Sequence, residues 1–463
     1  MEIPKRSFTR REFLKKNSLA AGAGVALGMG IPSVPLFAGA INNSDTPAIL
    51  GGTPVHRGDW QRWPVWNPET DEKRVLEVLR SGVWSRAEVV TEFEAAWAKT
   101  MGAKRCLTVV NGTNALICAI ANFDIGAGDE VIVPPYTFIA TIQAVLQNGA
   151  IPVFVDTDPE TFQIDARKIE EKITGRTRAI LPVHLAGLPA DMERIMAIAR
   201  KHNLLVIEDA CQAWLAEVNH KKVGTIGNAG CFSFQNSKHI PMGEGGAVVS
   251  DDDEFMDKCF SYHSFGSPYG AVGGDSGSGI VRLGTKLRLT EYQAAMGLAQ
   301  LKRLEDQSKT RSENAAYLTS LMKEIPGIAP HTLYPEVTRA AFHLYPFRYQ
   351  KAEFMGLSRD SFLKALRAEG VPCSTGYTPL NKMPFLGNAF RTKNFQRMYS
   401  KEMLNIEKYY ADNECPENDR LCNEEAVWFT QNMLLGPKSD MNDIASAIGK
   451  IRKNAAKIKQ QIG

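Results

Sequence analysis

Between residues 100 and 260, short apolar runs alternate with amphipathic stretches of helical character. The runs have the length and the β-branched content of buried strands, and they cover residues 131–133, 152–155, 179–183, 204–207, 230–234 and 247–249. Strands that alternate with helices form a mainly parallel sheet with helices on both faces. The sequence therefore predicts an α/β fold, in which a ligand binds beyond the carboxyl ends of the strands.

The segments outside this region predict an N-terminal arm over residues 41–70, a large domain over 71–310 and a small C-terminal α/β domain over 311–463. Helical patterns and one strand-like run mark these parts: we expect helices over 69–80, 191–202, 290–323, 359–369 and 442–457, and a strand over 343–349. A Gly/Ser-rich segment over 270–279 is predicted to be a connector, with a lid as the alternative.

Residues 1–40 have the features of an export leader. Thr9-Arg-Arg-Glu-Phe-Leu-Lys15 is followed by an apolar, Gly/Ala-rich stretch over 19–29 and by Ala38-Gly-Ala40, which suits a cleavage site. The paired arginines are typical of a twin-arginine leader, and the apolar stretch is too short to span a bilayer stably. An ordinary amphipathic helix is the alternative, but the stretch has no polar face. We predict export to the periplasm, with a cytoplasmic location if the leader is not used.

The charge balance of the rest of the chain does not favour nucleic-acid binding. Residues 1–40 hold six Lys/Arg and two Asp/Glu, and the remainder has 48 basic and 49 acidic residues. The eight cysteines and eight histidines form no zinc-ligand pattern, so we predict no metal site. Most cysteines lie in apolar segments, as in core packing. Cys415 and Cys422 could pair after export, which only their geometry can establish.

Lys238 and Asp209 stand where pyridoxal phosphate chemistry needs them. Lys238 follows the apolar run 230–234, and Asp209 comes just past the run 204–207. The cofactor requires a lysine amine that forms an imine with its aldehyde, and a carboxylate that keeps its pyridine nitrogen protonated so that the ring accepts electrons. Each residue alone is more often a surface side chain. Their combination with the residues below favours the cofactor site.

A phosphate site is predicted from three residues. The segment 109–116 runs from an apolar stretch through Gly112 and Thr113 into a helical pattern. The free amides at such a helix start, together with the Thr113 hydroxyl, bind phosphate. Ser233 is placed to add a hydroxyl to the same phosphate. On its own a strand–glycine–helix turn is common and does not identify a site.

Two further residues are predicted to contact the cofactor ring. Phe138, in Pro134-Pro-Tyr-Thr-Phe138, offers an aromatic ring that can stack on the pyridine. Gln212, three residues past Asp209, can contact the phenolic oxygen of the ring. Taken singly, the aromatic residue is more often part of a core, and the glutamine is equally often satisfied by backbone groups.

These residues lie within motifs that resemble, in order, those of the DegT/StrS family of sugar and cyclitol aminotransferases. The matching segments are Asn111-Gly-Thr113, Gly128-Asp-Glu-Val-Ile-Val-Pro-Pro-Tyr-Thr-Phe138, Pro152-Val-Phe-Val-Asp156, Pro182-Val-His-Leu-Ala-Gly187, Glu208-Asp-Ala-Cys-Gln-Ala213, Phe232-Ser-Phe-Gln-Asn-Ser-Lys238 and Gly243-Glu-Gly-Gly246. The resemblance covers residues 50–460 or so. It implies the pyridoxal-phosphate fold of type I, with a seven-stranded, mainly parallel sheet, a smaller C-terminal domain and a homodimer.

The resemblance also implies a role for each residue of the predicted site. These roles are the imine-forming lysine for Lys238, the pyridinium partner for Asp209, phosphate ligands for Gly112, Thr113 and Ser233, the stacking aromatic for Phe138 and the phenolate contact for Gln212. The implied activity is transfer of an amino group from glutamate or glutamine to a keto-sugar or keto-cyclitol. Two alternatives stay open: a dehydratase of the same family, in which some members have histidine in place of the lysine, and a non-catalytic sensor that binds cofactor or sugar.

The chain departs from the family pattern at one position. The family has asparagine in a Gly-x-Asn-x-Arg segment that reaches the cofactor of the neighbouring subunit, whereas this chain has Lys286 in Gly284-Thr-Lys-Leu-Arg288. The amine could bind the phosphate, bind an anionic substrate or face solvent. Segments around Trp84 and Tyr377 resemble cyclitol-type members, and these two side chains are candidates for the substrate pocket or for the core.

Overall fold

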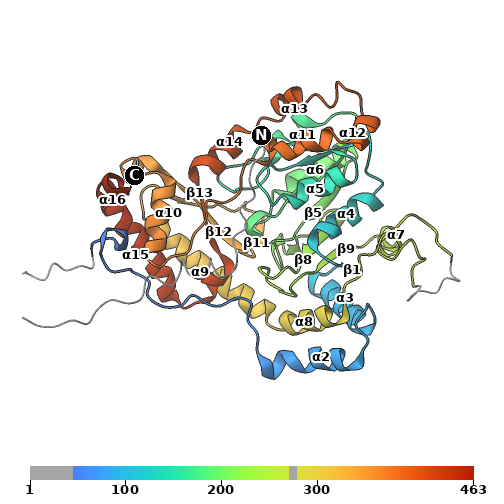
Figure 1. Cartoon of the computed structure of the whole chain (residues 1–463), viewed down its shortest axis with the longest axis horizontal. Coiled ribbons are helices and arrows are strands. Elements are labelled where there is room, and N and C mark those ends of the chain that lie inside the picture. The colour runs from blue at the N-terminus through green and yellow to red at the C-terminus, as the bar shows by residue number, and fades with distance from the viewer. Residues whose placement is uncertain (1–44, 271–278, 463) are drawn as a thin grey trace, which may run out of the picture. The chain divides into compact units, whose positions relative to one another are not determined.

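A seven-stranded sheet with the order β1-β9-β8-β5-β4-β2-β3 dominates the computed structural model, which describes residues 45–270 and 279–462 (Figure 1). The strands are parallel except β9, which pairs antiparallel with both β1 and β8. Each predicted apolar run overlaps one strand, so the α/β class with a mainly parallel sheet is confirmed. The strands are β1 Arg105–Val109, β2 Glu130–Val133, β3 Ile151–Phe154, β4 Thr177–Ile180, β5 Leu205–Asp209, β8 Ala229–Ser233 and β9 Gly246–Ser250.

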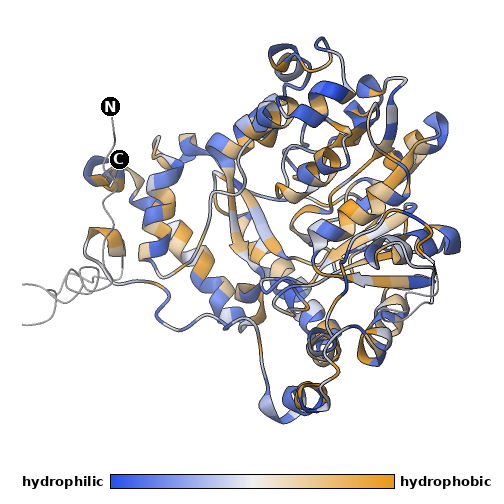
Figure 2. Ribbon diagram, turned by 45° about the vertical axis from the view of Figure 1, so that its right-hand side comes forward, coloured by the Kyte–Doolittle hydropathy of each residue, from blue (hydrophilic) through white to orange (hydrophobic). Residues whose placement is uncertain are grey.

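Helices cover both faces of this sheet because successive strand residues point to opposite sides. Val131 and Val133 pack into one apolar cluster with side chains of α4, α5 and α7, whereas Ile132 packs into a second cluster with side chains of α3, α6 and α8. Figure 2 shows the apolar strands and the apolar sides of these helices meeting in the interior. The helices are α2 Pro68–Ser81, α3 Glu88–Met101, α4 Gly112–Asn122, α5 Ala140–Gln147, α6 Met192–His202, α7 Asp253–His263 and α8 Glu291–Leu301.

The C-terminal part builds a second sheet of three antiparallel strands, β10-β12-β13, against helices α9, α10, α15 and α16. The single helical pattern predicted over 290–323 is two helices, α8 and α9, and the pattern over 442–457 is also divided between two helices. The elements are α9 Leu304–Met322, β10 Ile328–Pro330, β12 Leu344–Tyr349, α10 Arg359–Ala368, β13 Ala426–Thr430, α15 Lys438–Lys453 and α16 Ala455–Ile462. A third small sheet joins β6 Glu217–Val218, β7 Lys221–Lys222 and β11 Val337–Arg339.

The described residues belong to one compact unit, Ser44–Gly463. The boundary predicted between residues 310 and 311 falls inside α9, and the division into a large and a small domain stays a prediction. The predicted leader with its cleavage site after Ala40, and nearly all of the 270–279 segment, lie outside the described residues.

A helical insertion covers the edge strand β3. Its polar side chains bond to the backbone of that edge: the amide of Phe154 donates to Asn413 Oδ1 at 2.7 Å, and the Tyr409 hydroxyl donates to the Pro152 carbonyl at 2.6 Å. An edge strand covered in this way offers fewer free hydrogen-bonding groups to another chain. The insertion comprises α11 Pro384–Phe390, α12 Lys393–Met398, α13 Ile406–Asp412, α14 Pro416–Arg420 and a π-helix at Leu421–Glu425.

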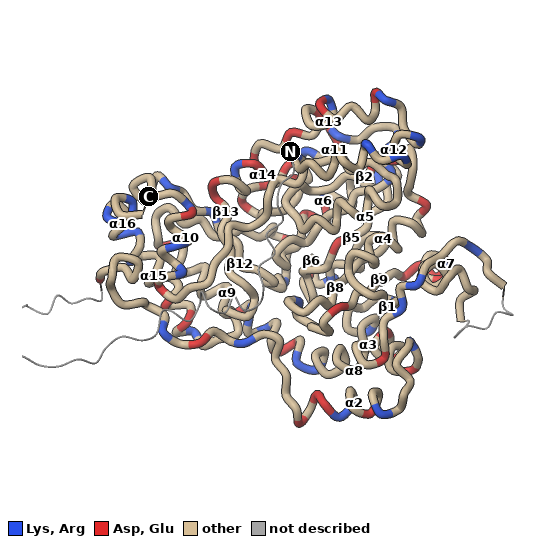
Figure 3. Tube along the Cα trace, in the orientation of Figure 1, with Lys and Arg blue, Asp and Glu red and all other residues tan. Residues whose placement is uncertain are grey.

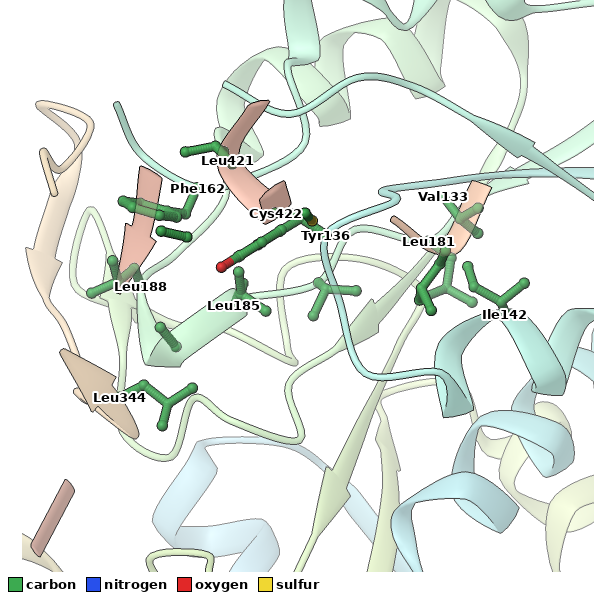
Figure 4. Packing of buried hydrophobic residues seen from close by; sticks show 14 of the residues in the cluster. Val133, Tyr136, Ile142, Phe162, Leu181, Leu185, Leu188, Leu344, Leu421 and Cys422 are labelled. Carbon is green, nitrogen blue, oxygen red and sulfur yellow. The ribbon is translucent and has the colours of Figure 1, made fainter. Parts of the chain in front are cut away.

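The last part of the insertion, the π-helix, packs into the same apolar cluster as residues next to the sheet. Figure 4 shows Tyr136 and Phe162, which follow β2 and β3, near Leu421 and Cys422 of the π-helix. All eight cysteines are free thiols in the structure. Cys415 and Cys422 are both buried, and the disulfide considered above is not formed between them. Short 3-10 turns complete the fold at Ala48–Leu50, Ala166–Lys168, Glu170–Lys172, Leu185–Gly187, Lys351–Phe354, Leu380–Lys382 and Gln431–Leu435.

Basic and acidic residues are interspersed along the helices and loops of the described part (Figure 3). Among these residues no helix is long and apolar enough to cross a membrane. The same part of the chain holds no cluster of three or more His, Cys, Asp or Glu side chains that could bind a metal ion.

Candidate active site

A cavity of about 770 Å³ lies beyond the carboxyl ends of β1, β2, β5 and β8. Parallel strands place their carboxyl ends at one edge of the sheet, which is why residues far apart in sequence meet there. All seven residues of the predicted site line this cavity: Gly112, Thr113, Phe138, Asp209, Gln212, Ser233 and Lys238. The sequence therefore identified a set of residues that the fold brings together.

Lys238 lies in the loop between β8 and β9, and both its backbone N–H and its backbone carbonyl are hydrogen-bonded. Its amide donates to the Gln235 carbonyl at 2.8 Å, and its carbonyl accepts from Trp63 Nε1 at 3.2 Å. The side-chain Nζ lies 3.5 Å from His343 Nε2. Burial lowers the pKa of Lys238, against the opposing charges of Cys211 and Asp209. A lowered pKa increases the fraction of neutral amine, which is the nucleophilic form.

Asp209 faces the cavity because it alternates with Glu208 along β5. Glu208 is fully buried on the other side, where it accepts hydrogen bonds from the amides of Gly224, Ile226 and Gly227, each at 2.7 Å. His184 Nε2 lies 2.9 Å from the same carboxylate. The hydrogen bonds of Glu208 are thus used within the fold, and Asp209 is the acid that is left to the cavity.

The Asp209 carboxylate is fixed in direction by two donors. Thr141 Oγ1 donates to its Oδ2 at 2.8 Å, and the amide of Cys211 donates to its Oδ1 at 3.2 Å. Thr141 Oγ1 is in turn 3.0 Å from Thr137 Oγ1. Each carboxylate oxygen has a second lone pair, so the group can still accept a hydrogen bond from a donor in the cavity. Thr141 was not predicted, although it lies three residues past Phe138, one helical turn into the next segment.

The start of α4 forms an anion-binding corner against the end of β8. Asn111 caps the helix by accepting from the amide of Asn114 at 2.9 Å, which leaves the first amides of the helix free for another acceptor. A Cβ at Gly112 would lie 2.7 Å from Ser233 Cβ and 2.9 Å from Cys211 Sγ. Glycine is therefore required for this close approach, which brings the helix start and the Ser233 hydroxyl together.

Phe138 and Gln212 differ in how firmly they are held. Phe138 is 58% exposed at the cavity rim. Gln212 is buried, accepts from the amide of Ala186 at 2.8 Å and donates to the Tyr377 hydroxyl at 3.0 Å. Burial raises the pKa of Tyr377, so its hydroxyl stays neutral. The contacts of Phe138 and Gln212 with a cofactor ring stay predictions.

Comparison with known proteins identifies the family. The model of the DegT/DnrJ/EryC1/StrS aminotransferase family matches residues 67–411. The chain belongs to this family. An L-glutamine:2-deoxy-scyllo-inosose aminotransferase of Streptomyces paromomycinus is 34% identical over 88% of this chain and 98% of that protein. Crystal structures of 3-amino-5-hydroxybenzoic acid synthase (30% identity, TM-score 0.73, 86% of this chain and 99% of that one) and of an aminotransferase from Psychrobacter cryohalolentis (31%, 0.73, 86% and 100%) are similar.

Membership of the DegT/DnrJ/EryC1/StrS family makes the chain a pyridoxal-phosphate-dependent aminotransferase of fold type I. The cavity fits that cofactor on three observations. The α4 start and Ser233 offer donors for a phosphate, buried Asp209 offers an oriented carboxylate for a ring nitrogen, and the Lys238 amine lies in the same cavity. These residues would hold the cofactor.

Two predicted candidates lie elsewhere. Trp84 is exposed and donates to the Leu79 carbonyl at 3.1 Å, and it is absent from the cavity lining among the described residues, whereas Tyr377 lines the cavity. Lys286 is exposed, and its backbone pairs with that of Ser264 in an isolated antiparallel β-bridge. Its contact with a cofactor would need a second subunit and stays a prediction.

The lining residues outside the predicted site include Trp63, His343, Trp428 and Gln431, which come from parts of the chain outside the large sheet. Trp63 comes from the N-terminal arm, and the other three from the C-terminal sheet and the turn after it. A signal existed for Gln431, since two polar residues, Thr430 and Gln431, follow the apolar run 426–429. Nothing in the local sequence pairs that strand end with Lys238.

Proposed function

We propose that this enzyme transfers the amino group of L-glutamine to a free keto-cyclitol or keto-sugar. The observation that carries the proposal is the meeting of Lys238, Asp209 and the free amides at the start of α4 in one cavity. Relatives that are 32–34% identical over most of their length are named L-glutamine:2-deoxy-scyllo-inosose aminotransferases, which supports glutamine as donor and a cyclitol ketone as acceptor.

The wall of the cavity supports an uncharged, polyhydroxylated acceptor. Beyond the predicted cofactor residues, its described lining includes amides, hydroxyls and indole rings, namely Trp63, Asn111, Gln235, Ser237, Tyr377, Trp428, Thr430, Gln431 and Asn432, together with one carboxylate, Glu244, and one imidazole, His343. Hydroxyl groups of a ring bond to amides and hydroxyls, while its carbon faces pack on indole. Lys238 is the single Lys or Arg side chain in the described lining, which argues against a nucleotide-linked substrate because a diphosphate is normally bound by several cations.

The chain's own groups account for the proton movements. Bound pyridoxal phosphate carries the amino group and draws electrons from the carbon that loses its proton. Lys238 Nζ, whose pKa is lowered by burial, would take that proton and return it to the neighbouring carbon. Asp209 would hold a proton on the ring nitrogen through its carboxylate, which Thr141 and the Cys211 amide keep in place. Trp63, through its bond to the Lys238 carbonyl, fixes the loop that carries the amine.

Two half-reactions test the proposal. Enzyme loaded with pyridoxamine phosphate is mixed with a panel of keto-cyclitols, keto-sugars and nucleotide-linked keto-sugars, and the return of visible cofactor absorbance is followed. We expect rapid return with a free keto-cyclitol or keto-sugar, and loss of absorbance when pyridoxal-loaded enzyme meets glutamine. Release of ammonia without an amino donor would instead identify a dehydratase.

We further propose that the enzyme works as a homodimer in which Lys286 reaches the cavity of the partner subunit. Exposed apolar side chains support an interface: Val83, Trp84, Ile280, Val281 and Leu283. Leu283, 89% exposed, is three residues from Lys286. Sedimentation should give about twice the mass of the chain. Lys286→Ala should then weaken binding of the cofactor or of an anionic substrate, and a monomer with full activity would contradict this arrangement.

Export by the twin-arginine route is proposed from residues 1–40 alone. Replacing Arg10 and Arg11 together by lysine should keep the protein in the cytoplasm, as measured by fractionation. Periplasmic recovery of the doubly substituted protein would contradict the proposal.

A further inference from the structure

Arg311, on α9, is a fully buried guanidinium that forms no ion pair within the described part of the chain. Its Nε donates to Gln431 Oε1 at 2.8 Å, and its carbon Cζ lies 5.2 Å from the centre of the Trp63 ring. The remaining two nitrogens have no hydrogen-bond partner among the described residues. Burial lowers the pKa of Arg311 to about 9, which leaves it protonated at neutral pH. A buried charge without a counter-ion is costly, and such costs concentrate at functional sites.

The contact with Arg311 fixes the orientation of the Gln431 side chain. Arginine has donors and no acceptor, so the oxygen of the amide must face it. The other end of the amide, the NH₂ group, donates to no acceptor in the described residues, while Gln431 itself lines the cavity. Gln431 therefore offers a donor to a ligand. Because its oxygen accepts from a charged group, the amide is polarised and its N–H groups become stronger donors.

We propose that Gln431, held by Arg311, is the residue that recognises the carboxylate of the amino donor. This inference rests on the proposed function and specifies how its donor is selected. The polarised amide brings the positive potential of Arg311 to the cavity wall without exposing a cation there. Lys238, the single Lys or Arg side chain of the described lining, is the reacting amine and cannot serve as a permanent carboxylate partner.

The location of Gln431 agrees with such a role. His343, which lies 3.5 Å from Lys238 Nζ, immediately precedes β12, and Gln431 immediately follows the neighbouring strand β13. Leu344 pairs with Thr430 across these two strands, so the two polar residues are adjacent to one cross-strand pair. Trp63 contacts both sides, through its bond to the Lys238 carbonyl and its ring over Arg311. The polarised amide and the reacting amine thus share one section of the wall.

The test compares two unreactive probes on the holoenzyme. Glutaramate has the glutamine skeleton without its amino group and keeps a carboxylate, and glutaramide is its neutral counterpart. We expect calorimetry to show that the wild type binds glutaramate at least about tenfold more tightly, because a charge-assisted bond is lost in glutaramide. Gln431→Glu should remove or reverse this preference. It should also raise the KM for glutamine about tenfold or more and leave the ketone half-reaction within about twofold.

Gln431→Glu separates recognition from stability. The new carboxylate pairs with Arg311 and compensates its charge, so the melting temperature should not fall although the donor to the cavity is gone. Asn314→Ala is the matched control on the same helix: Asn314 Nδ2 donates to the carbonyls of Leu434 and Gly436 at 2.9 and 2.8 Å, outside the cavity lining. This control should lower the melting temperature and keep the glutaramate preference.

Four outcomes would overturn the proposal. Gln431→Glu could keep the wild-type preference for glutaramate, Asn314→Ala could lose that preference equally, or the ketone half-reaction could be the one that slows. Loss of the preference in Lys286→Ala with its retention in Gln431→Glu would assign the carboxylate to the partner subunit and also overturn it. The binding comparison does not depend on turnover, so a protein that transfers no amino group can still support or refute the role of Gln431.

Discussion

The two sides of the cavity are built in different ways. The sheet side, with Gly112, Asp209, Ser233 and Lys238, comes from the ends of β1, β5 and β8 and the loops that follow them. The C-terminal side takes Trp63 from the N-terminal arm and the rest from segments beyond residue 340: His343, Tyr377, Trp428 and Gln431. A parallel sheet brings its strand ends together as a consequence of its topology. The C-terminal side depends instead on contacts between segments that no local pattern connects.

Their polar groups differ in the same way. On the sheet side, Asp209 and Gln212 are oriented by backbone amides and by Thr141 and Tyr377. On the C-terminal side, buried polar atoms remain without partners among the described residues, including His343 Nδ1 and two nitrogens of Arg311. Satisfied groups provide a fixed geometry for a cofactor. On the C-terminal side, the NH₂ group of Gln431 in the cavity lining is left for a ligand that comes and goes. We expect substitutions on the sheet side to affect both half-reactions and those on the C-terminal side to affect one.

Replacing Lys238 should give the largest effect on the sheet side. Lys238→Met removes both the covalent anchor and the proton carrier, so turnover should fall by about 10³-fold or more and the visible absorbance of the cofactor should be lost. Steady-state rates and absorbance spectra measure the two effects. Turnover that persists in this variant would remove Lys238 from the reaction.

The same variant has a pH signature in the cofactor-free protein. Burial is the largest influence on the Lys238 amine and lowers its pKa in the folded state, against the charges of Cys211 and Asp209. The unfolded chain therefore binds more protons between this lowered pKa and the ordinary value of 10.5, and stability rises with pH through that window. Lys238→Met should melt at a higher temperature than the wild type near neutral pH, and the difference should shrink toward pH 10.5. A constant difference would show that burial does not destabilise the charged amine.

Asp209→Asn should give the second largest effect and should slow both half-reactions equally. Thr141 and the Cys211 amide donate to different oxygens of Asp209, and the NH₂ group that replaces one of these oxygens in asparagine cannot accept. Asparagine also has no charge to hold a proton on the ring nitrogen. We expect cofactor binding to persist and both rates to fall by about 10²-fold. Stopped-flow measurement of each half-reaction checks the equality. A loss confined to one half-reaction would erase the contrast between the two sides of the cavity.

The sequence predicted the sheet side well and the C-terminal side poorly, for physical reasons. Apolar runs give the strands, and the polar residues at their ends give Asp209, Ser233 and Lys238, because a short motif and one topology rule suffice. The helical pattern over 290–323 did not show the break between α8 and α9, since both helices have good helix formers throughout. The helical pattern that includes Arg311 did not predict that its side chain is fully buried. Its contact with Gln431 spans 120 positions, a separation that no pattern in either segment records.

Tyr377→Phe should give the smallest effect, because Tyr377 connects the two sides through one hydrogen bond. Its hydroxyl accepts from Gln212 Nε2 at 3.0 Å, while Gln212 Oε1 keeps its bond from the Ala186 amide. Removing the hydroxyl leaves one buried N–H unpaired, which should cost about 1 kcal/mol of stability. We expect rates to fall by less than about tenfold, and mainly in the ketone half-reaction, since Asp209 and Lys238 are untouched. Denaturant melts and the two half-reaction rates measure this. If both half-reactions slow equally, Gln212 positions the cofactor through Tyr377, and the two sides of the cavity function as one.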